Sequence, residues 1–278
     1  MKNFKKLSVA LLSLALMIPL AACGKKDQAS SDPNTLKVAM EAGYAPYNWT
    51  QNDDSNGAVK IEGSNEYAGG YDVMVAKKVA DELGKNLVVV KTEWDGLPPA
   101  VQSGKVDLIM AGMSPTEKRK EQIDFTKPYW VSDYVIIVRK DGKYKNAKSL
   151  ADLKGAKITG QLNTIHYDLI DQIPGVQKQE AMSDFPQMRV ALQSGIIDGY
   201  VAESPEGKSV LKSMPDFAVV TFEPGKGFKV EDNENVIAAG VKKGSDLTEK
   251  VNKVLDKLTE QDRQNLMNQA IENQPVNK

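Results

Sequence analysis

Apolar residues recur with two different periods along the chain, and each period predicts one kind of element. Residues 36–40 alternate apolar and polar side chains, which is typical of a half-buried β-strand. Residues 87–90 are Leu-Val-Val-Val and predict a buried strand. Between them, five apolar residues fall on one face of a helix that should end near Gly84: Val73, Ala76, Val79, Ala80 and Leu83. Because helix and strand keep alternating afterwards, we expect an α/β architecture.

Two fifteen-residue stretches repeat one pattern. Residues 100–114, AVQSGKVDLIMAGMS, and residues 191–205, ALQSGIIDGYVAESP, align without gaps and share six of fifteen residues at the same places. Each stretch is expected to end a helix, turn at Ser-Gly and start a strand at Val106 or Ile196. The repeat indicates two lobes built on similar βαβ plans, and the alternative is a chance similarity of a common helix–turn–strand unit.

The repeat also predicts where chemistry lies. In open α/β sheets, ligands bind beyond the carboxyl ends of the strands. Gly112 and Glu203 occupy equivalent positions at two such strand ends, and Glu41 follows the first strand directly. Residues 41–49 contain Gly and Pro and predict a loop at that place. We therefore expect these residues to face one crevice between the lobes.

The segment 112–126, GMSPTEKRKEQIDFT, predicts a helix start that carries unusual charge. Ser114 suits the N-cap, Pro115 the first helical position, and Glu117 the third position of a capping box. Residues 118–120 are Lys-Arg-Lys, at the end of the helix where the backbone dipole is already positive. The charge requires a nearby anion, unless these residues form a solvated cationic face.

The N-terminal segment predicts export and lipidation. Residues 1–22 carry three lysines among their first six residues and continue with an apolar run that is shorter than a membrane-spanning helix. This pattern is typical of a signal peptide. Leu-Ala-Ala before Cys23 resembles a lipobox, so we expect diacylation of this residue, the only cysteine in the chain. Residues 23–34 suit a flexible tether. The alternative is an ordinary signal peptide with a chance cysteine.

Composition narrows the class of protein. A chain of 278 residues with 41% hydrophobic side chains can bury a large core in one or two domains. The formal net charge of −1 gives no indication of a nucleic-acid partner. We find no metal-ligand cluster, phosphate-binding loop or nucleophile elbow in the sequence, and hence predict no catalytic residue, metal or cofactor. The sole histidine, His166, is assigned no role.

Three motifs carry a family resemblance: GYAPYNW (43–49), WDGLPPAVQSGKVDLIMAGMSPTEKRKEQIDFTKPYW (94–130) and SGIIDGYVAES (194–204). With them, the chain from about residue 35 to 275 resembles the extracytoplasmic substrate-binding proteins of polar amino-acid ABC transporters, of the type that binds lysine, arginine, ornithine or histidine. The resemblance implies the α/β, two-lobed periplasmic-binding-protein-like fold of type II, with two crossover strands and the ligand in the cleft.

The resemblance also implies an arrangement of the lobes. Lobe 1 should comprise residues 35–136 and 223–278, and lobe 2 residues 137–222. The first crossing is expected over 133–140, DYVIIVRK, and the return around Phe217–Phe222. The apolar face of the C-terminal helix should pack on lobe 1.

The expected ligand contacts begin with the α-carboxylate. Arg119 matches the arginine that pairs with this group, and a guanidinium offers two parallel donors to it. Ser114 and Thr164 match residues that contact the same carboxylate, and Gly112 and Met113 belong to the same expected contact region. The ligand would then supply the anion that the charged helix start requires.

The second lobe should recognise the ammonium. Glu203 matches the acidic residue that accepts the α-ammonium, so that opposite charges on facing lobes would bind a zwitterion. The run GQLNTIHY departs from the usual Gly-Thr-Thr-Gln type: Leu162 and Asn163 replace the first two of those residues, and Ile165 stands where glutamine is frequent. The second-lobe carboxylate contacts depend on this divergent segment.

The side-chain slot suggests the ligand. Tyr44 and Trp94 match two aromatic residues that sandwich the ligand side chain, and Glu41 matches an acidic residue near the far end. A carboxylate there favours a cation, and a planar guanidinium stacks best between rings, so arginine is favoured. The alternatives are that the aromatic residues belong to the core and Glu41 is solvated, or that the ligand is a neutral polar amino acid such as glutamine.

The expected function is delivery of a free amino acid to an ABC permease by hinge closure, with no catalysis. The protein is expected to be a monomer, lipid-anchored through Cys23 to the outer face of a bacterial membrane. A dehydratase-type enzyme on the same fold and a surface adhesin or sensor are the alternatives.

Overall fold

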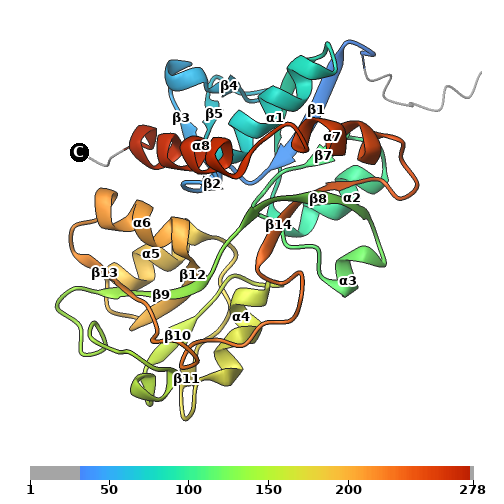
Figure 1. Ribbon diagram of the computed structural model, residues 1–278. Coiled ribbons are helices and arrows are strands. Elements are labelled where there is room, and N and C mark those ends of the chain that lie inside the picture. Colours follow the sequence, from blue (N-terminus) through green and yellow to red (C-terminus); the bar gives the residue numbers. More distant parts are fainter. Residues whose placement is uncertain (1–31, 276–278) are drawn as a thin grey trace, which may run out of the picture. The chain divides into compact units, whose positions relative to one another are not determined.

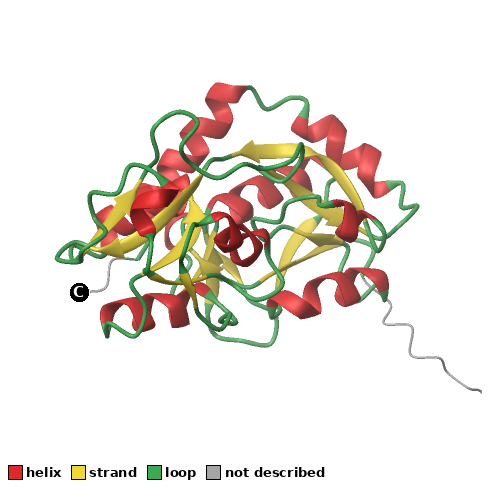
Figure 2. Cartoon of the chain, turned by 90° about the horizontal axis from the view of Figure 1, so that it is seen from below, coloured by secondary structure: helices red, strands yellow, loops and turns green. Residues whose placement is uncertain are grey.

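The computed structural model describes residues 32–275. The expected signal peptide over 1–22, the expected lipidation site Cys23 and the tether up to residue 31 lie outside the described residues. Two five-stranded sheets, a small four-stranded sheet and the helices around them make up the described chain (Figures 1 and 2). Within it, no helix is long and apolar enough to cross a membrane.

The first five-stranded sheet has the order β6-β1-β7-β14-β8. Its strands are β1 (Thr35–Met40), β6 (Asn86–Lys91), β7 (Leu108–Ile109), β8 (Asp124–Val131) and β14 (Val236–Val241). β1 runs parallel to β6 and β7, whereas β14 is antiparallel to β7 and β8. The predicted helix is α1 (Tyr71–Glu82), and Gly84 takes the left-handed φ of 64° expected just beyond its end.

The second five-stranded sheet has the order β11-β10-β12-β9-β13. Its strands are β9 (Tyr134–Arg139), β10 (Lys157–Thr159), β11 (Gln177–Lys178), β12 (Gly199–Glu203) and β13 (Phe217–Val220). The helices α4 (Ile165–Leu169), α5 (Phe185–Gln193) and α6 (Ser204–Ser213) accompany it. We call the second sheet with these helices the second lobe. The first lobe is the first sheet with the helices that pack on it and with the segment between β1 and α1.

The segment expected to be a loop after β1 contributes a third sheet, which the sequence did not predict. This antiparallel sheet has the order β2-β3-β5-β4, with β2 (Gly43–Tyr44), β3 (Asn48–Gln51), β4 (Val59–Lys60) and β5 (Tyr67–Gly69). The remaining short elements are α2 (Leu97–Gln102), α3 (Glu117–Lys120), η1 (Ser55–Gly57), η2 (Trp94–Gly96), η3 (Leu150–Leu153) and η4 (Ile170–Gln172).

The two copies of the internal repeat form equivalent hydrogen bonds. Asp107 precedes β7, and its Oδ2 accepts the backbone N–H of Lys37 in β1 at 2.8 Å. Asp198 precedes β12, and its Oδ2 accepts the N–H of Lys157 in β10 at 2.9 Å. The shared aspartate thus joins two parallel strands in each lobe, which supports two lobes on one plan over chance similarity. The two strands begin two and three residues later than expected.

The crossings between the sheets differ from the expected positions. β8 ends at Val131 in the first sheet and β9 begins at Tyr134 in the second, so the first crossing lies at Ser132 and Asp133 and not over 133–140. On the return, Phe228 and Val230 still pack against the core of the second lobe, beyond the expected boundary at residue 223.

Two helices end the chain, α7 (Leu247–Leu255) and α8 (Glu260–Asn273). α7 packs on β8 and α1 of the first lobe, as predicted, with Val251, Val254 and Leu255 buried. α8 contacts both α1 and α6, so it touches elements of the two lobes (Figure 1).

Candidate functional site

The candidate residues lie at or after the carboxyl ends of parallel strands in both lobes. Glu41 follows β1, Trp94 starts η2 after β6, and residues 112–114 follow β7. In the second lobe, Thr164 precedes α4 after β10, and Glu203 is the last residue of β12. The strand ends that the hydrophobic pattern predicted thus carry the candidate side chains.

The helix that carries Arg119 begins later than predicted. α3 starts at Glu117, and its N-cap is Thr116, whose Oγ1 accepts the backbone N–H of Arg119 at 3.3 Å. Ser114 is not the cap, because its hydroxyl donates to the backbone oxygen of Glu234 at 3.0 Å, just before β14. The predicted capping box is therefore wrong, and Ser114 joins this loop to the last strand of the first sheet.

Arg119 is held by groups from both lobes. Its Nη1 donates to Ser114 O at 2.8 Å and its Nη2 to Asn163 O of the second lobe at 3.3 Å. The guanidinium carbon lies 4.9 Å from the centre of the Trp94 ring. Burial lowers the pKa of Arg119 to about 10, so the side chain remains charged at neutral pH. The guanidinium is thereby fixed, while several of its five N–H donors remain for an anion.

The second lobe contributes a buried polar cluster of Thr164, His166 and Glu203, which are 5%, 6% and 2% exposed. His166 Nδ1 lies 3.2 Å from Thr164 Oγ1, and its Nε2 lies 2.9 Å from Glu203 Oε2. Burial raises the pKa of Glu203 well above its ordinary value. Burial, assisted by the charge of Arg119, lowers the pKa of His166 to about 3. The histidine without an assigned role therefore lies between two candidate ligand residues, and its ring is neutral.

Several buried polar atoms around this cluster lack hydrogen-bond partners among the described residues. They are Glu203 Oε2, His166 Nε2 and the hydroxyls of Tyr44 and Tyr47. The Tyr44 ring lies 6.4 Å from the His166 ring and 5.1 Å from the Tyr47 ring, so these residues are neighbours. Buried polar groups are normally paired, and a group of unpaired ones indicates a position for a polar ligand or water.

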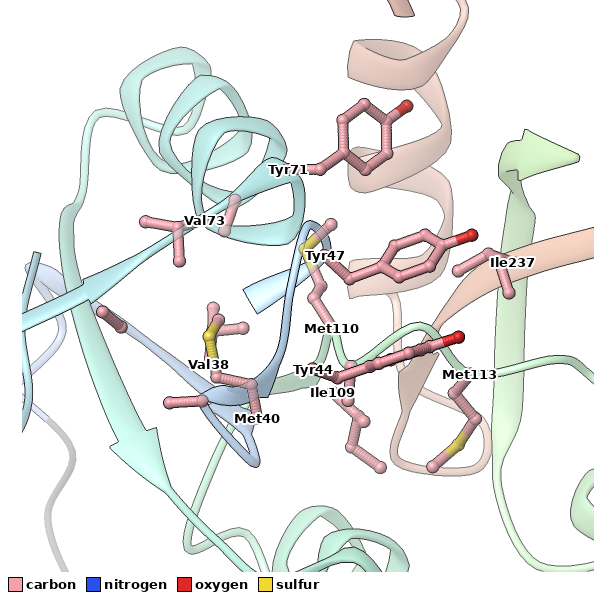
Figure 3. Close-up of a cluster of buried hydrophobic side chains, with 14 of the residues drawn as sticks. Val38, Met40, Tyr44, Tyr47, Tyr71, Val73, Ile109, Met110, Met113 and Ile237 are labelled. Atoms are coloured by element: carbon pink, nitrogen blue, oxygen red, sulfur yellow. The ribbon is translucent and has the colours of Figure 1, made fainter. Parts of the chain in front are cut away.

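Another aromatic ring covers one face of Tyr44. Its ring stacks on Phe185, the first residue of α5, with centroids 3.8 Å apart and planes 15° apart. Tyr44 lies below Tyr47 and Tyr71 in one column, with the hydroxyls towards the same side (Figure 3). Gly112 has φ of 60°, and a Cβ there would lie 3.3 Å from the Tyr44 ring. The expected pair of Tyr44 and Trp94 is thus replaced by Tyr44 on Phe185 and Trp94 on Arg119.

Asp72, which follows Tyr71 of this column in the chain, carries a buried carboxylate. Asp72 accepts hydrogen bonds from Tyr129 Oη at 2.7 Å and from Asn48 Nδ2 at 2.8 Å. Burial raises the pKa of Asp72 to about 7, although hydrogen bonds from these two side chains and from the backbone of Gly112 oppose the shift. Asp72 therefore ties the loop after β7 to α1.

Glu41 lies among acidic side chains at the other end of the site. Its Oε1 accepts a hydrogen bond from Gln161 Nε2 of the second lobe at 2.8 Å. Burial, together with the charges of Asp184, Glu93 and Asp95, raises the pKa of Glu41 to about 8. Glu41 also lines a groove of about 610 Å³ between first-lobe residues and α5. The local potential is negative and would stabilise a cation.

Residues 161–163 connect the lobes directly. Besides the Gln161–Glu41 bond, Asn163 Nδ2 donates to both Asp95 carboxylate oxygens at 2.9 and 3.1 Å. Trp94 Nε1 donates to Asn163 O at 3.3 Å. The segment that departs from the usual family run therefore forms an interlobe contact, which the sequence did not predict.

The sequence held a signal for one of the missed residues. Phe185 aligns with Trp94 when the internal repeat is extended upstream, which places both beside the strand ends. His166 carried no such signal.

Met113 is buried at 1% exposure, with its backbone oxygen accepting the N–H of Ala238. Within residues 32–275, no three or more His, Cys, Asp or Glu side chains are arranged to hold a metal ion.

These features define a two-lobed binding protein with polar groups of opposite charge in both lobes. The chain belongs to the bacterial extracellular solute-binding proteins, family 3, whose model matches residues 36–271. It is therefore an extracytoplasmic protein of a non-enzymatic family.

Characterised relatives are similar over nearly the whole chain. A Campylobacter jejuni protein described as "Probable histidine-binding protein" is 31% identical, covering 91% of this chain and 93% of its own length. The arginine-binding extracellular protein ArtP of Bacillus subtilis is 27% identical, covering 91% and 92%. Among solved structures, a Streptococcus pneumoniae amino-acid ABC transporter substrate-binding protein bound to L-arginine matches with a TM-score of 0.74. It is 30% identical, and the match covers 86% of this chain and 94% of that one.

Proposed function

We propose that this protein binds a free basic amino acid, with L-arginine favoured, and delivers it to an ABC permease by closure of the two lobes. The observation that carries the proposal is that Glu203 of the second lobe lies 2.9 Å from His166, whose pKa is lowered by burial and by the charge of Arg119 of the first lobe. A zwitterion has opposite charges a few ångströms apart, which suits Arg119 and Glu203.

Recognition of the two backbone ions would be divided between the lobes. Arg119 can offer its remaining N–H donors to the α-carboxylate, whereas the Thr164 hydroxyl already donates to the backbone oxygen of Gln161. Glu203 would accept the α-ammonium. Since the unpaired Oε2 of Glu203 is buried, a donor that reaches it would gain more than it would at an exposed carboxylate.

The acidic end of the site favours a cationic side chain. Burial first, and then the charges of Asp184, Glu93 and Asp95, raise the pKa of Glu41 to about 8, so its carboxyl group is largely protonated at neutral pH without a ligand. A guanidinium or ammonium there would lower this pKa and ionise Glu41. The arginine bound by the solved relative from Streptococcus pneumoniae agrees with this preference.

Closure would follow from contacts that exist only when the lobes meet. Gln161–Glu41, Asn163–Asp95 and Tyr44–Phe185 all join residues of the two lobes. A ligand that touches both lobes adds to these contacts and shifts the population towards the closed form. The closed form is the one that would dock on the permease.

The anchoring of the protein belongs to the same proposal. Diacylation of Cys23 would hold the binding domain at the outer face of the cell membrane through the tether over 23–34. In cells labelled with palmitate, wild-type protein should carry label in the membrane fraction, and Cys23→Ser should appear unlabelled in the soluble fraction. Equal membrane retention of both proteins would refute the anchor.

Binding is tested by thermal unfolding and calorimetry of protein refolded to remove carried ligand. The twenty amino acids are screened singly, and L-arginine or L-lysine should raise the midpoint most, because a ligand at 100 times its Kd stabilises by about 2.7 kcal/mol. A larger shift with L-glutamine would move the assignment to neutral polar amino acids. No shift with any amino acid would refute the proposed function.

A further inference from the structure

His166 links two candidate ligand residues that are not neighbours in the sequence. Its ring follows Thr164 by two residues and contacts it through Nδ1, whereas its Nε2 faces Glu203 on β12. The ring is 6% exposed and is surrounded edge-on by aromatic rings of Tyr44, Tyr134 and Phe185. Its orientation is therefore set by packing as well as by polar contacts.

The hydrogen bonds around Thr164 determine the tautomer of this ring. Thr164 Oγ1 lies 2.7 Å from the backbone oxygen of Gln161, which can only accept, so the threonine hydroxyl donates its proton there. In its contact with His166 Nδ1, the same oxygen must then accept, and Nδ1 carries the proton. A neutral ring with a proton on Nδ1 has an unprotonated Nε2, which is an acceptor.

Two buried acceptors thus face each other, since Nε2 lies 2.9 Å from Glu203 Oε2. The pair is not aligned as a hydrogen bond, and neither atom has another partner among the described residues. Burial favours the uncharged form of both groups, because it raises the pKa of Glu203 and lowers that of His166. Of the two facing atoms, Glu203 Oε2 and His166 Nε2, the proton therefore belongs on the Glu203 carboxyl group.

We propose that His166 is a ligand-binding and positioning residue, whose Nε2 joins Glu203 in accepting N–H bonds from the α-ammonium of the ligand. This inference rests on the proposed function. An ammonium brings three donors to the two acceptors, and it displaces the proton that Glu203 holds. Glu203 becomes a carboxylate, and one proton leaves for the solvent. The charge of the buried pair changes by one unit as the ammonium arrives, which keeps the site neutral.

The consequence is a dependence of affinity on pH with a definite sign. Since binding releases a proton, affinity falls as the pH is lowered below the pKa of Glu203 in the free protein, by up to about tenfold per pH unit. The titratable and charged groups facing His166 are Glu203 from β12, Arg119 from α3, Tyr44 from β2 and Tyr134 from β9. Tyr134 stays neutral because burial raises its pKa, and Arg119 stays charged. Glu203, whose pKa burial and the neighbouring Glu206 raise, is therefore the group beside His166 that titrates.

The first test reads the ring itself and needs no ligand. His166 is the only histidine, so the untagged full chain labelled with ¹⁵N-histidine gives one pair of ring signals. We expect the proton on Nδ1, an unprotonated Nε2 and no protonation of the ring between pH 8 and 5. A proton on Nε2, or a ring that titrates between pH 8 and 5, would overturn the inference whatever the protein binds.

The second test uses the Glu41→Gln protein, because Glu41, whose pKa is about 8, would itself release a proton when a cationic side chain binds. Protons released on binding L-arginine are measured by calorimetry between pH 5 and 8 in buffers of different ionisation enthalpy, and up to one proton should be released in this background. His166→Phe should weaken binding about tenfold or more and change the proton release, and the control Tyr167→Phe, whose hydroxyl only donates to Gln179 O, should do neither. His166→Gln, which keeps a polar group near Nε2, should recover part of the affinity.

The outcomes separate the inference from the proposed function. Binding without proton release, together with a His166→Phe protein that is folded and binds as wild type, would overturn the inference and leave the function intact. If His166→Phe does not fold, proton release by the Glu41→Gln protein alone decides. If wild type binds no amino acid, the proposed function fails, and the ligand role of His166 fails with it.

Discussion

Replacement of Arg119 is the perturbation whose effect the structure predicts most fully. The guanidinium is positioned by Ser114 O at 2.8 Å, by Asn163 O at 3.3 Å and by the Trp94 ring. Arg119→Ala would leave the ligand carboxylate without its charged partner in a partly desolvated site. Arg119→Lys would keep the charge but would lose the planar pair of donors and the stacking geometry.

The expected magnitudes follow from the cost of removing such partners. Truncating one member of a buried, hydrogen-bonded charge pair costs about 2–5 kcal/mol, which corresponds to a roughly 30-fold to 4,000-fold higher Kd for Arg119→Ala. A hydrogen bond to a charged group contributes about 1.5–3 kcal/mol, so Arg119→Lys should raise Kd roughly 10-fold to 150-fold.

Isothermal titration with L-arginine, L-lysine and L-glutamine measures these effects, with circular dichroism to verify folding. The α-carboxylate is common to all amino acids, so both Arg119 variants should weaken every ligand by a similar factor. Lys118→Ala is the matched control, because Lys118 is the adjacent exposed cation of α3. A folded Arg119→Ala protein that binds within threefold of wild type, or loses only basic ligands, would refute the reasoning.

Three further predictions concern the acidic end, the interlobe segment and the buried carboxylate of Asp72. Glu41→Gln should weaken L-arginine and L-lysine about tenfold in calorimetry but leave L-glutamine within twofold, and an equal loss for all three would remove Glu41 from the specificity argument. Asn163→Gly, which suits the local φ of 58°, should raise koff for L-arginine about two- to tenfold in stopped-flow experiments through loss of the Asp95 bonds, and an unchanged koff would contradict the closure role. Asp72→Asn should flatten the pH dependence of stability: the folded pKa of Asp72, about 7, exceeds its ordinary 3.8, so its stabilising contribution is complete below about pH 4 and is lost as the pH rises through 7. Thermal midpoints of wild type and Asp72→Asn between pH 4 and 8 measure this difference, and parallel curves would exclude the effect.

The sequence predicted the frame of the site because the frame depends on local patterns. Alternation of apolar residues identified β1, a helical stripe identified α1, and the repeat placed Glu203 at the end of a strand. In both lobes, the apolar pattern predicts where a strand ends, and the residue after the strand takes its position from that end. The α/β class and the strand ends could therefore be predicted from single segments, whereas the two-lobed fold followed from the family resemblance.

The errors and omissions involve contacts between distant segments. By local preference Ser114 is the better cap, but Glu234 O, which is 120 residues away, accepts the Ser114 hydroxyl and leaves Thr116 as the cap. Likewise, the Tyr44–Phe185 stack and the Gln161–Glu41 bond form only when the two lobes meet. Local propensity contains no information on such pairs.

His166 shows the same limit for chemistry. In the sequence it is one histidine in a divergent loop. Its neutral state follows from burial and from the charge of Arg119, and its second acceptor follows from Glu203 lying 2.9 Å away. Neither can be read from the residues beside it.

The most direct measurement is a crystal structure of the protein grown with L-arginine. The account predicts the ligand carboxylate on Arg119, the ammonium on Glu203 beside His166 Nε2, and the guanidinium towards Glu41. A ligand held within one lobe alone, or with its ammonium on a carboxylate other than Glu203, would contradict the claim that opposite charges on the two lobes close around an amino acid.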